Sequence, residues 1–379
     1  MSKMKKLLVS LCALLAVCAS ANAQGMTATL QQGDRMTPFY GPDAFVQAYN
    51  AAPQKGAVIT LSSGEFNTVD SIMKEVTIIG NGYRDNKTVL KGRNFDSYII
   101  HGTALSISLV IRANNVTLEG LEMHCVMIRN TNHLTIKHCS IYNLWGETNN
   151  SQSTQILPAQ HKNTIVDQCI IGVEFANSGE NYCIKNSIVT IFMARNNGDA
   201  VNTLISNCII GCTNSESATL LPHAVYKNCF MGTAFSANEN IVYDCSTESG
   251  YEFYNNVFFG GVSPSSSLNL KDGYYKIVLT KNQDSVSRTP ELYWSESNTC
   301  KGNTAASYNA VFGDSDEENP LLAPIITTIK GDDGTVVGPY GGTGFSVNPS
   351  IPRIVDSKID SITDAEGKLN VKIKVEVNQ

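Results

Sequence analysis

Basic segments are what this chain most clearly lacks. Charged residues make up 16% of its 379 residues, acidic residues outnumber basic ones by 34 to 28, and the formal net charge is −6. A protein that follows a nucleic-acid backbone neutralises phosphates with a stripe or patch of lysine and arginine, and the body of the chain has no such cluster. Nucleic acid is therefore not an expected partner.

Long hydrophobic runs are also lacking, except for one at the start of the chain. There three lysines precede an apolar run that ends in the small-residue site Ala21-Asn22-Ala23, which is the pattern of a secretory signal peptide. Cleavage after residue 23 would leave 25 basic and 34 acidic residues, a net charge of −9. No other segment is long and apolar enough to span a bilayer. The sequence thus predicts a bacterial protein that is secreted, periplasmic or on the cell surface.

Helical patterns are rare as well, and short β-prone triplets between polar turn residues take their place. In a recurring unit, two triplets flank a polar residue and a cysteine. Six stretches align without gaps: TIKHCSIYN (135–143), TIVDQCIIG (164–172), CIKNSIVT (183–190), TLISNCIIG (203–211), VYKNCFMG (225–232) and IVYDCSTE (241–248). What we call the cysteine position is held by Cys139, Cys169, Ser187, Cys208, Cys229 and Cys245, with Leu121 one unit earlier. FYNNVFFGG (253–261) echoes the pattern.

A repeat of about 20 residues with only short strands and bends is typical of one coil of a parallel β-solenoid, whose strands pair with counterparts about 4.8 Å away. A leucine-rich repeat shares the period but needs a regular leucine pattern that these units lack. The polar residue before the cysteine position suits a left-handed bend, and stacked asparagine amides would form a ladder there. The best examples of this residue are Asn186, Asn207, Asn228 and Asn256.

The cysteines of the repeat are expected to be free thiols that fill the interior. In-register side chains on neighbouring coils have Cβ atoms about 4.8 Å apart, beyond the roughly 3.5 to 4.5 Å that a disulfide prefers. Cysteine then acts as a small apolar residue. Cys183, Cys212 and Cys300 lie outside this column, and the sequence leaves their pairing open.

These units resemble the pectate-lyase-like superfamily of right-handed parallel β-helices. GPDAFVQAYNAAPQKGAVITLSSGEF (41–66), followed by KEVTIIGNGY (74–83), is similar to that superfamily's helix cap and first strands. The expected helix would cover the open end of the coil with one apolar face. That face consists of Ala44, Phe45, Ala48 and Tyr49. The predicted fold is all-β: a right-handed parallel β-helix with an N-terminal helix cap and a C-terminal β-hairpin or cap.

The chain is expected to divide into a signal peptide (1–23), a β-helix (24–345) and a C-terminal hairpin or capping segment (346–379). The β-helix would contain a helix cap near 41–53 and excursions near 143–163 and 262–300. Within it, the glycine-rich VVGPYGGTGF (336–345) looks like a closing coil. RIVDSKIDSI (353–362) and KLNVKIKVEV (368–377) alternate apolar and charged residues around a turn, which predicts the hairpin.

The superfamily contains lyases, hydrolases and adhesins, so the resemblance predicts fold more firmly than function. Its lyases use an Arg or Lys base with Ca²⁺ held by several carboxylates. HLTIKHCSIYN (133–143) resembles the lyase segment whose strand ends in Asp-His, but Lys137 stands in the Asp place and cannot ligate Ca²⁺. The sequence leaves Ca²⁺ open as a cofactor, but its usual carboxylate cluster is not seen and no metal ligand is predicted. The Asn-Thr-Asp, Gly-His-Gly and Arg-Ile-Lys motifs of polygalacturonases are absent.

Candidate functional residues lie on the expected first sheet and in the loops beside it. The catalytic candidates are Glu147, Glu174, Glu216 and Arg195, and the substrate-binding candidates are Trp145, His161 and Arg129. Two carboxylates can act as acid and base, an arginine can hold a uronate or sulfate, and a tryptophan can stack on a sugar. Each also has a structural interpretation, as a surface charge, a structural arginine or a lid over the sheet.

The sequence predicts a secreted β-helix protein that binds an extracellular polysaccharide, with depolymerisation by a lyase or hydrolase reaction as an additional hypothesis. The alternative is a non-enzymatic adhesin that presents loops on a rigid solenoid. A cleft with clustered carboxylates and an aromatic platform would favour the enzyme, whereas a flat neutral face would favour the adhesin.

Overall fold

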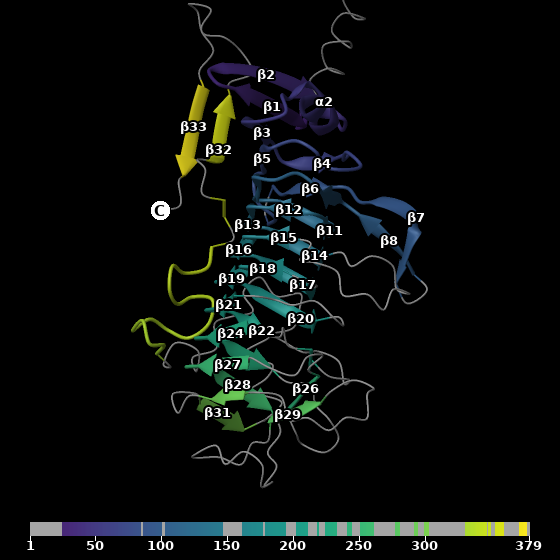
Figure 1. Ribbon diagram of the computed structural model, residues 1–379. Helices are drawn as coiled ribbons and strands as arrows, with labels where there is room; N and C mark the ends of the chain where they lie inside the picture. Colours follow the sequence, from purple (N-terminus) through teal and green to yellow (C-terminus); the bar gives the residue numbers. More distant parts are fainter. Residues whose placement is uncertain are drawn as a thin grey trace, which may run out of the picture.

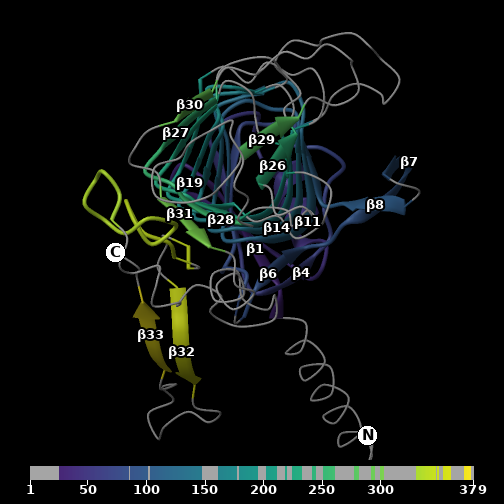
Figure 2. The same ribbon diagram turned by 90° about the horizontal axis from the view of Figure 1, so that it is seen from below.

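The chain coils into a parallel β-solenoid whose strands stack along one axis (Figure 1). Two long sheets follow this axis and enclose the hydrophobic core, as the end-on view in Figure 2 shows. The predicted fold class, an all-β parallel β-helix with an N-terminal helix and a C-terminal hairpin, is confirmed. The computed structural model describes residues 25–84, 86–100, 103–146, 161–176, 179–194, 202–210, 218–219, 224–232, 241–244, 251–260, 277–280, 292–294, 299–302, 330–346, 348–349, 353–359 and 371–376.

The first long sheet, sheet A, has twelve strands. In spatial order they are β2 (Arg35–Tyr40), β1 (Thr27–Gln32), β3 (Ala57–Leu61), β5 (Val76–Ile79), β10 (Val116–Glu119), β13 (Leu134–Lys137), β16 (Ile165–Asp167), β19 (Cys183–Lys185), β21 (Thr203–Ser206), β24 (Ala224–Lys227), β27 (Tyr251–Tyr254) and β30 (Leu292–Trp294).

The second long sheet, sheet B, has eleven strands. They are β4 (Gly64–Phe66), β6 (Thr88–Leu90), β11 (Glu122–Ile128), β14 (Ser140–Gly146), β17 (Ile170–Ala176), β20 (Ile188–Ala194), β22 (Ile209–Ile210), β25 (Phe230–Gly232), β28 (Val257–Gly260) and β31 (Thr299–Gly302), with β9 (Leu109–Ile111) beside β11. The smaller sheets are β12 (Thr131–Asn132), β15 (His161–Lys162) and β18 (Gly179–Glu180); β23 (Ala218–Thr219), β26 (Ile241–Asp244) and β29 (Ile277–Thr280); and the pair β7 (Arg93–Ile100) and β8 (Thr103–Ile107).

The cysteine position forms one continuous column at the corner between the two sheets. Leu121, Cys139, Cys169, Ser187, Cys208 and Cys229 are all 0% exposed. From Cys139 onward, the residue after each of these positions donates its backbone N–H to the carbonyl oxygen of the same position one coil earlier. Ile170 N–H donates to Cys139 O, and Ile188 N–H donates to Cys169 O, both at 2.9 Å. The alignment therefore located the corner correctly over these coils.

The alignment of the last stretch, IVYDCSTE (241–248), as a unit of the same repeat is wrong. β26, which contains IVYD, pairs with β23 and β29 in a small separate sheet, whereas β24 pairs directly with β27. Asn256 therefore follows Cys229 in the column; its Oδ1 accepts from Cys229 N–H at 2.9 Å and its Nδ2 donates to Tyr226 O at 2.8 Å. A β-prone triplet before Asp-Cys marks a strand, but it does not show to which sheet the strand belongs.

Three of the four predicted left-handed bends are present, whereas the fourth lies at Asn255 (φ 51°) and not at Asn256. The expected amide ladder lies at a different corner. Asn186, Asn207 and Asn228 have φ of 47°, 51° and 54°. Rather than stacking on one another, Asn186 and Asn228 bond to a distant part of the chain. The amide-to-amide ladder joins Asn132, Asn163, Asn181 and Asn202, with Nδ2···Oδ1 distances of 2.8, 2.9 and 3.2 Å.

The distant partner is a segment that we call the C-terminal strap, residues 330–346 with 348–349. It runs back along the corner toward the N-terminal end, beside the solenoid in Figure 1, so the predicted closing coil at 336–345 is wrong. Asn186 Nδ2 donates to Pro339 O (2.9 Å) and Gly341 O (2.5 Å). Farther along, Ser346 N–H donates to Gln168 Oε1 at 2.7 Å.

An ion pair and an apolar contact hold the other part of the strap. Asp332 pairs with Lys227 at 2.6 Å, and this hydrogen bond lowers the pKa of the Asp332 carboxyl below its usual value. Val337 packs on an outer column of sheet B that consists of Ile188, Ile209, Phe230 and Val257. The strap thus covers an apolar row that would otherwise face solvent.

The N-terminal end is closed as predicted by a helix, α2 (Ala44–Ala51), whose buried residues are Ala44, Phe45, Ala48 and Tyr49. The sequence did not predict the hairpin of β1 and β2, which pairs antiparallel with β3 and places β2 at the sheet edge. Lys74 Nζ donates to the carbonyl oxygens of Tyr49 (2.8 Å) and Ala52 (2.7 Å), which satisfies acceptors at the helix C-terminus. At the other end of the sequence, β32 (Arg353–Ile359) and β33 (Val371–Glu376) form the predicted hairpin.

Some sequence predictions fall outside the described residues. These include the signal peptide, Cys212, Cys245 and most of the segment 262–300. The side chain of Cys300, in β31, is not described either.

We predict that the described cysteines are reduced. Cys125, Cys139, Cys169, Cys183, Cys208 and Cys229 are free, and all except Cys183 are buried. Burial raises the pKa of Cys125 to about 12, so this thiol stays protonated and unreactive. Thiol titration after denaturation without reductant should detect at least six thiols per chain, whereas in the native protein Cys183 should react before the other five described cysteines. Fewer than six in the denatured protein would contradict the free-thiol column.

Candidate functional site

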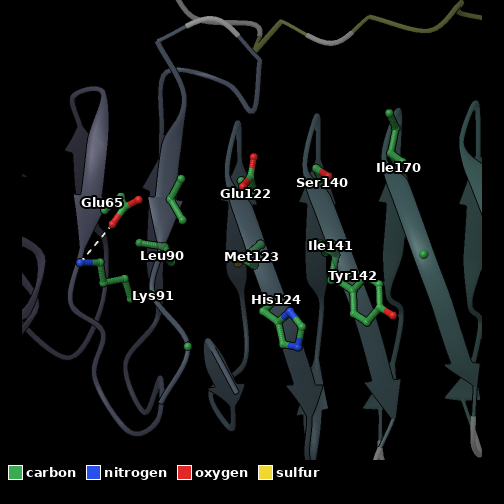
Figure 3. A pocket seen from close by; sticks show the side chains of 13 residues that line it. Glu65, Leu90, Lys91, Glu122, Met123, His124, Ser140, Ile141, Tyr142 and Ile170 are labelled. Atoms are coloured by element: carbon green, nitrogen blue, oxygen red, sulfur yellow. Dashed lines mark ion pairs between the residues drawn. The ribbon is translucent and has the colours of Figure 1, made fainter. Parts of the chain in front are cut away.

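A groove of about 500 Å³ lies on the outer face of sheet B and crosses β4, β6, β11, β14 and β17. We call it the Tyr142 groove. Strand alternation places Met123 and Ile141 in the core and their neighbours outside. The outward polar residues that line the groove are Glu65, Lys91, Glu122, His124, Ser140 and Tyr142, and Figure 3 shows them from close by.

The centre of the groove is an aromatic pair on adjacent strands. The rings of His124 and Tyr142 stack with centroids 5.0 Å apart and an angle of 12° between their planes, and they lie side by side in Figure 3. Tyr142 is 59% exposed. On the next coil, Gly172 takes the position that Tyr142 holds on its own coil. A Cβ at Gly172 would lie 2.7 Å from Tyr142 O and 3.4 Å from the Tyr142 ring, so any side chain there would crowd Tyr142. The tyrosine therefore has one face on histidine and its other side beside a residue without a side chain.

The strand geometry explains why these two rings project so far. Cα pairing between β11 and β14 is interrupted at His124 and Tyr142, between the pairs Met123–Ile141 and Cys125–Asn143. Met123 and Val126 both face the core, so two consecutive residues between them face outward. Such an irregularity bends a strand and re-aims a side chain.

Two ion pairs flank the aromatic pair. Lys87 Nζ lies 2.8 and 2.9 Å from the two carboxylate oxygens of Glu122. Lys91 Nζ lies 3.1 Å from Glu65 Oε2, the pair marked by a dashed line in Figure 3. These pairs are well exposed and add little to stability. They do place alternating donors and acceptors along the groove.

The C-terminal strap limits the groove at its far end. Ile170, which lines the groove, packs against the same apolar cluster as Tyr340 and Phe345 of the strap. Beyond Ile170, the same outward column continues as Ile188 and Ile209 beneath the strap. The open surface therefore stops at β17.

Among the predicted catalytic residues, only Glu174 belongs to a described strand. It lies in β17, paired with Leu144 on one side and Phe192 on the other. Leu144 and Val126, which hold the corresponding places on β14 and β11, are core residues. Glu147, Arg195 and Glu216 lie outside the described residues.

Trp145 lies in β14 and Arg129 directly follows β11, both away from the aromatic pair. Trp145 belongs to β14, so residues 143–146 are part of sheet B and not of an excursion. It packs with an apolar cluster on the outer face of the sheet, formed by Ile107, Val110, Cys125 and Met127. Trp145 is thus half-buried against the outer face of the sheet. Burial lowers the pKa of the Arg129 guanidinium from its usual value.

His161 is not part of a groove. It is 2% exposed, stacks edge-on with Tyr182 at 5.0 Å, and its Nδ1 lies 3.1 Å from the Thr164 hydroxyl. Burial lowers its pKa to about 4, so the imidazole is neutral at neutral pH. Gly179 lies against the ring, because a Cβ there would approach His161 Cε1 to 2.5 Å. The residue packs the corner between coils, so we leave it out of the candidate site.

The described residues contain no group of three or more His, Cys, Asp or Glu side chains placed to hold a metal ion. Lys137, at the place where the lyases carry a ligand, lies in register between Glu119 and Asp167. The next coil adds Lys185, which pairs with Asp167 at 3.2 Å. Lys137 therefore belongs to a row of alternating charges along sheet A.

The sequence contained a signal for the aromatic pair that the expected first sheet did not capture. Counting three residues past the cysteine position gives His124, Tyr142, Gly172 and Thr190 on consecutive coils. The alignment of the repeat thus predicts this row, provided that the outer face beside the corner is considered.

Comparisons with family models, with curated proteins and with solved structures find no match for this chain. In the part of the chain that the structure describes, no helix is long and apolar enough to cross a membrane. The chain is therefore classified by its fold alone, as a parallel β-solenoid.

Proposed function

We propose that this protein is a secreted β-helix protein that binds an extracellular polysaccharide in the Tyr142 groove without cleaving it. The observation that carries this proposal is the exposed Tyr142 ring, stacked on His124 in the middle of an open groove that also presents charged and hydroxyl groups. The predicted signal peptide supports an extracellular ligand.

The groove offers both kinds of contact that a sugar needs. A pyranose ring has an apolar face of C–H groups that packs on an aromatic ring, and hydroxyls around its edge that need donors and acceptors. Tyr142 and His124 supply the aromatic surface. Glu122, Lys91 and Ser140 lie around it within the same groove.

The ion pairs favour binding over hydrolysis. A glycosidase places two carboxyl groups across the scissile bond, and one of them must carry a proton to act as the acid. In the Tyr142 groove Glu122 and Glu65 are each engaged by a lysine. The groove therefore offers carboxylate acceptors for sugar hydroxyls, which suits binding.

Replacing Tyr142 with alanine is expected to weaken binding to the cognate polysaccharide by at least about tenfold, because a stacking surface worth about 1.4 kcal/mol is lost. The measurement is affinity electrophoresis or isothermal titration against a panel of plant, algal, microbial and host glycans. Tyr40→Ala is the matched control, since Tyr40 is 58% exposed in the edge strand β2. It should bind like the wild type.

Two outcomes would count against the proposal. Equal loss of affinity in the Tyr40 and Tyr142 variants would place the binding surface elsewhere. Absence of binding by the wild type across the whole panel would favour the adhesin alternative, in which the solenoid presents loops to a protein partner.

A further inference from the structure

We infer that the Tyr142 groove selects neutral glycans over uronate-containing or sulfated ones. This inference rests on the proposed function and names its ligand class. It departs from the sequence-based expectation that an arginine would hold an acidic sugar.

The fixed charges of the groove cancel. Glu65 faces Lys91 and Glu122 faces Lys87, with Nζ···O distances of 3.1 and 2.8 Å. No arginine lines the groove, and the remaining ionisable side chains in its described lining are His124 and Tyr142. The chain as a whole is acidic, with a formal net charge of −6. Nothing in the groove therefore supplies an unpaired cation for an anionic sugar.

An acidic polymer would also meet direct repulsion. To contact Lys87 or Lys91, a uronate would have to displace a glutamate that stays tethered beside the same ammonium. Anion recognition in proteins relies instead on uncompensated arginine or lysine groups, in which charge-assisted hydrogen bonds are available. Here both ammonium groups already have an anionic partner.

A neutral sugar fits the same groups. Each Lys–Glu pair presents a donor next to an acceptor, which matches two neighbouring hydroxyls that donate to the carboxylate and accept from the ammonium. Within the described residues, the structure gives the Ser140 hydroxyl no hydrogen-bond partner, so it is available to a ligand. The aromatic pair between the charged pairs contributes contacts that do not depend on charge.

The dimensions favour a short stretch of polymer that runs along the solenoid axis. From β4 to β17 the groove crosses five neighbouring strands of sheet B, a span of about 19 Å at the usual strand spacing. The lining ends on β17 with Ile170 and Gly172, and Ile170 packs on the same apolar cluster as Tyr340 and Phe345 of the C-terminal strap. A ligand chain is thus limited to a few sugar units within the groove.

The test compares neutral and acidic probes with the intact protein. The neutral set is xylan, mannan, β-glucan and galactan, and the acidic set is polygalacturonate, alginate and chondroitin sulfate. We expect at least one neutral polymer to bind in a Tyr142-dependent way, and every acidic polymer to bind at least tenfold more weakly. Tyr142-dependent binding that is strongest for an acidic polymer would overturn this inference and leave polysaccharide binding standing. No binding to either set would contradict the proposed function itself.

A second variant tests the electrostatic cause. Glu65→Gln with Glu122→Gln keeps the shape of both side chains and releases Lys91 and Lys87 from their anionic partners. This double variant should gain at least tenfold in affinity for polygalacturonate, and the gain should disappear in high salt. Thermal unfolding checks that the variant remains folded. If a folded variant shows no gain, the charge pairing does not set the ligand class.

Discussion

Replacing Asn186 with alanine is expected to lower the free energy of unfolding by about 3 to 5 kcal/mol and to release the C-terminal strap. Asn186 is 3% exposed, and its side chain makes three hydrogen bonds to the strap. Its Nδ2 donates to Pro339 O and Gly341 O, and the Thr343 hydroxyl donates to its Oδ1 at 2.9 Å. The alanine variant removes the donor to the buried Pro339 O and one of the two donors to Gly341 O, which also accepts from Gly344 N–H.

A second cost comes from the backbone. Asn186 has φ of 47°, in the left-handed region that asparagine tolerates and alanine does not, which adds about 1 kcal/mol. Asn186→Gly separates the two causes, because glycine accepts the bend but lacks the amide. The glycine variant should recover about 1 kcal/mol of the loss and no more.

The measurement combines thermal unfolding with limited proteolysis, followed by mass spectrometry of the C-terminal fragments. In the alanine and glycine variants, cleavage within 330–349 should become at least tenfold faster than in the wild type. Asn202→Gly is the control, since Asn202 also has a positive φ of 55° but its amide belongs to the exposed ladder. If the strap stays protected in Asn186→Ala, then the amide contacts do not hold it.

The repeat predicted the corner of the solenoid because every coil has the same steric requirement there. A small, apolar, inward side chain is needed at every coil, so Cys139, Cys169, Cys208 and Cys229 could be aligned by identity alone. The helix cap was predictable for a similar reason: Phe45 and Tyr49 repeat at a spacing that puts both on one face of a helix. Local patterns of this kind are visible in the sequence.

The C-terminal strap was not predictable, because its contacts join residues about 150 positions apart. Asn186 satisfies the same local rule whether its amide meets another asparagine, water or the strap. The glycines of 336–345 suggested turns, yet Gly338 and Gly341 also permit close approach: a Cβ at Gly338 would lie 2.5 Å from the Phe230 ring. Only the three-dimensional arrangement shows which role applies.

Strict alternation alone could not predict the candidate site, because β11 bends within the strand. Two outward residues follow each other at His124 and Cys125, so every later residue in β11 changes face. The same register carries into β17, where it puts Glu174 in line with Leu144. A single irregularity of this kind therefore changes which rows of side chains face outward, and strict alternation does not predict it.

Introducing a charge into the N-terminal cap should have an effect of at least the same size. We expect Phe45→Asp to lower the free energy of unfolding by more than about 4 kcal/mol, since the phenyl group is lost from the core and a carboxylate is buried without a partner. Phe45 is fully buried, and its ring lies 6.3 Å from that of Tyr49. Gln47→Asp places the same charge on the exposed face of α2 and should change stability by less than about 0.5 kcal/mol.

The cap variant should also change the association state. α2 packs against β1, β2 and β3, and these strands contribute Ala28, Leu30 and Ile59 to the core. When the helix detaches, this end of the solenoid exposes apolar side chains and strand edges, which favour self-association. Light scattering with size-exclusion chromatography should therefore detect oligomers of Phe45→Asp and monodisperse Gln47→Asp. If both variants keep the wild-type melting temperature and elution volume, the hairpin of β1 and β2 closes the coil alone and α2 is dispensable.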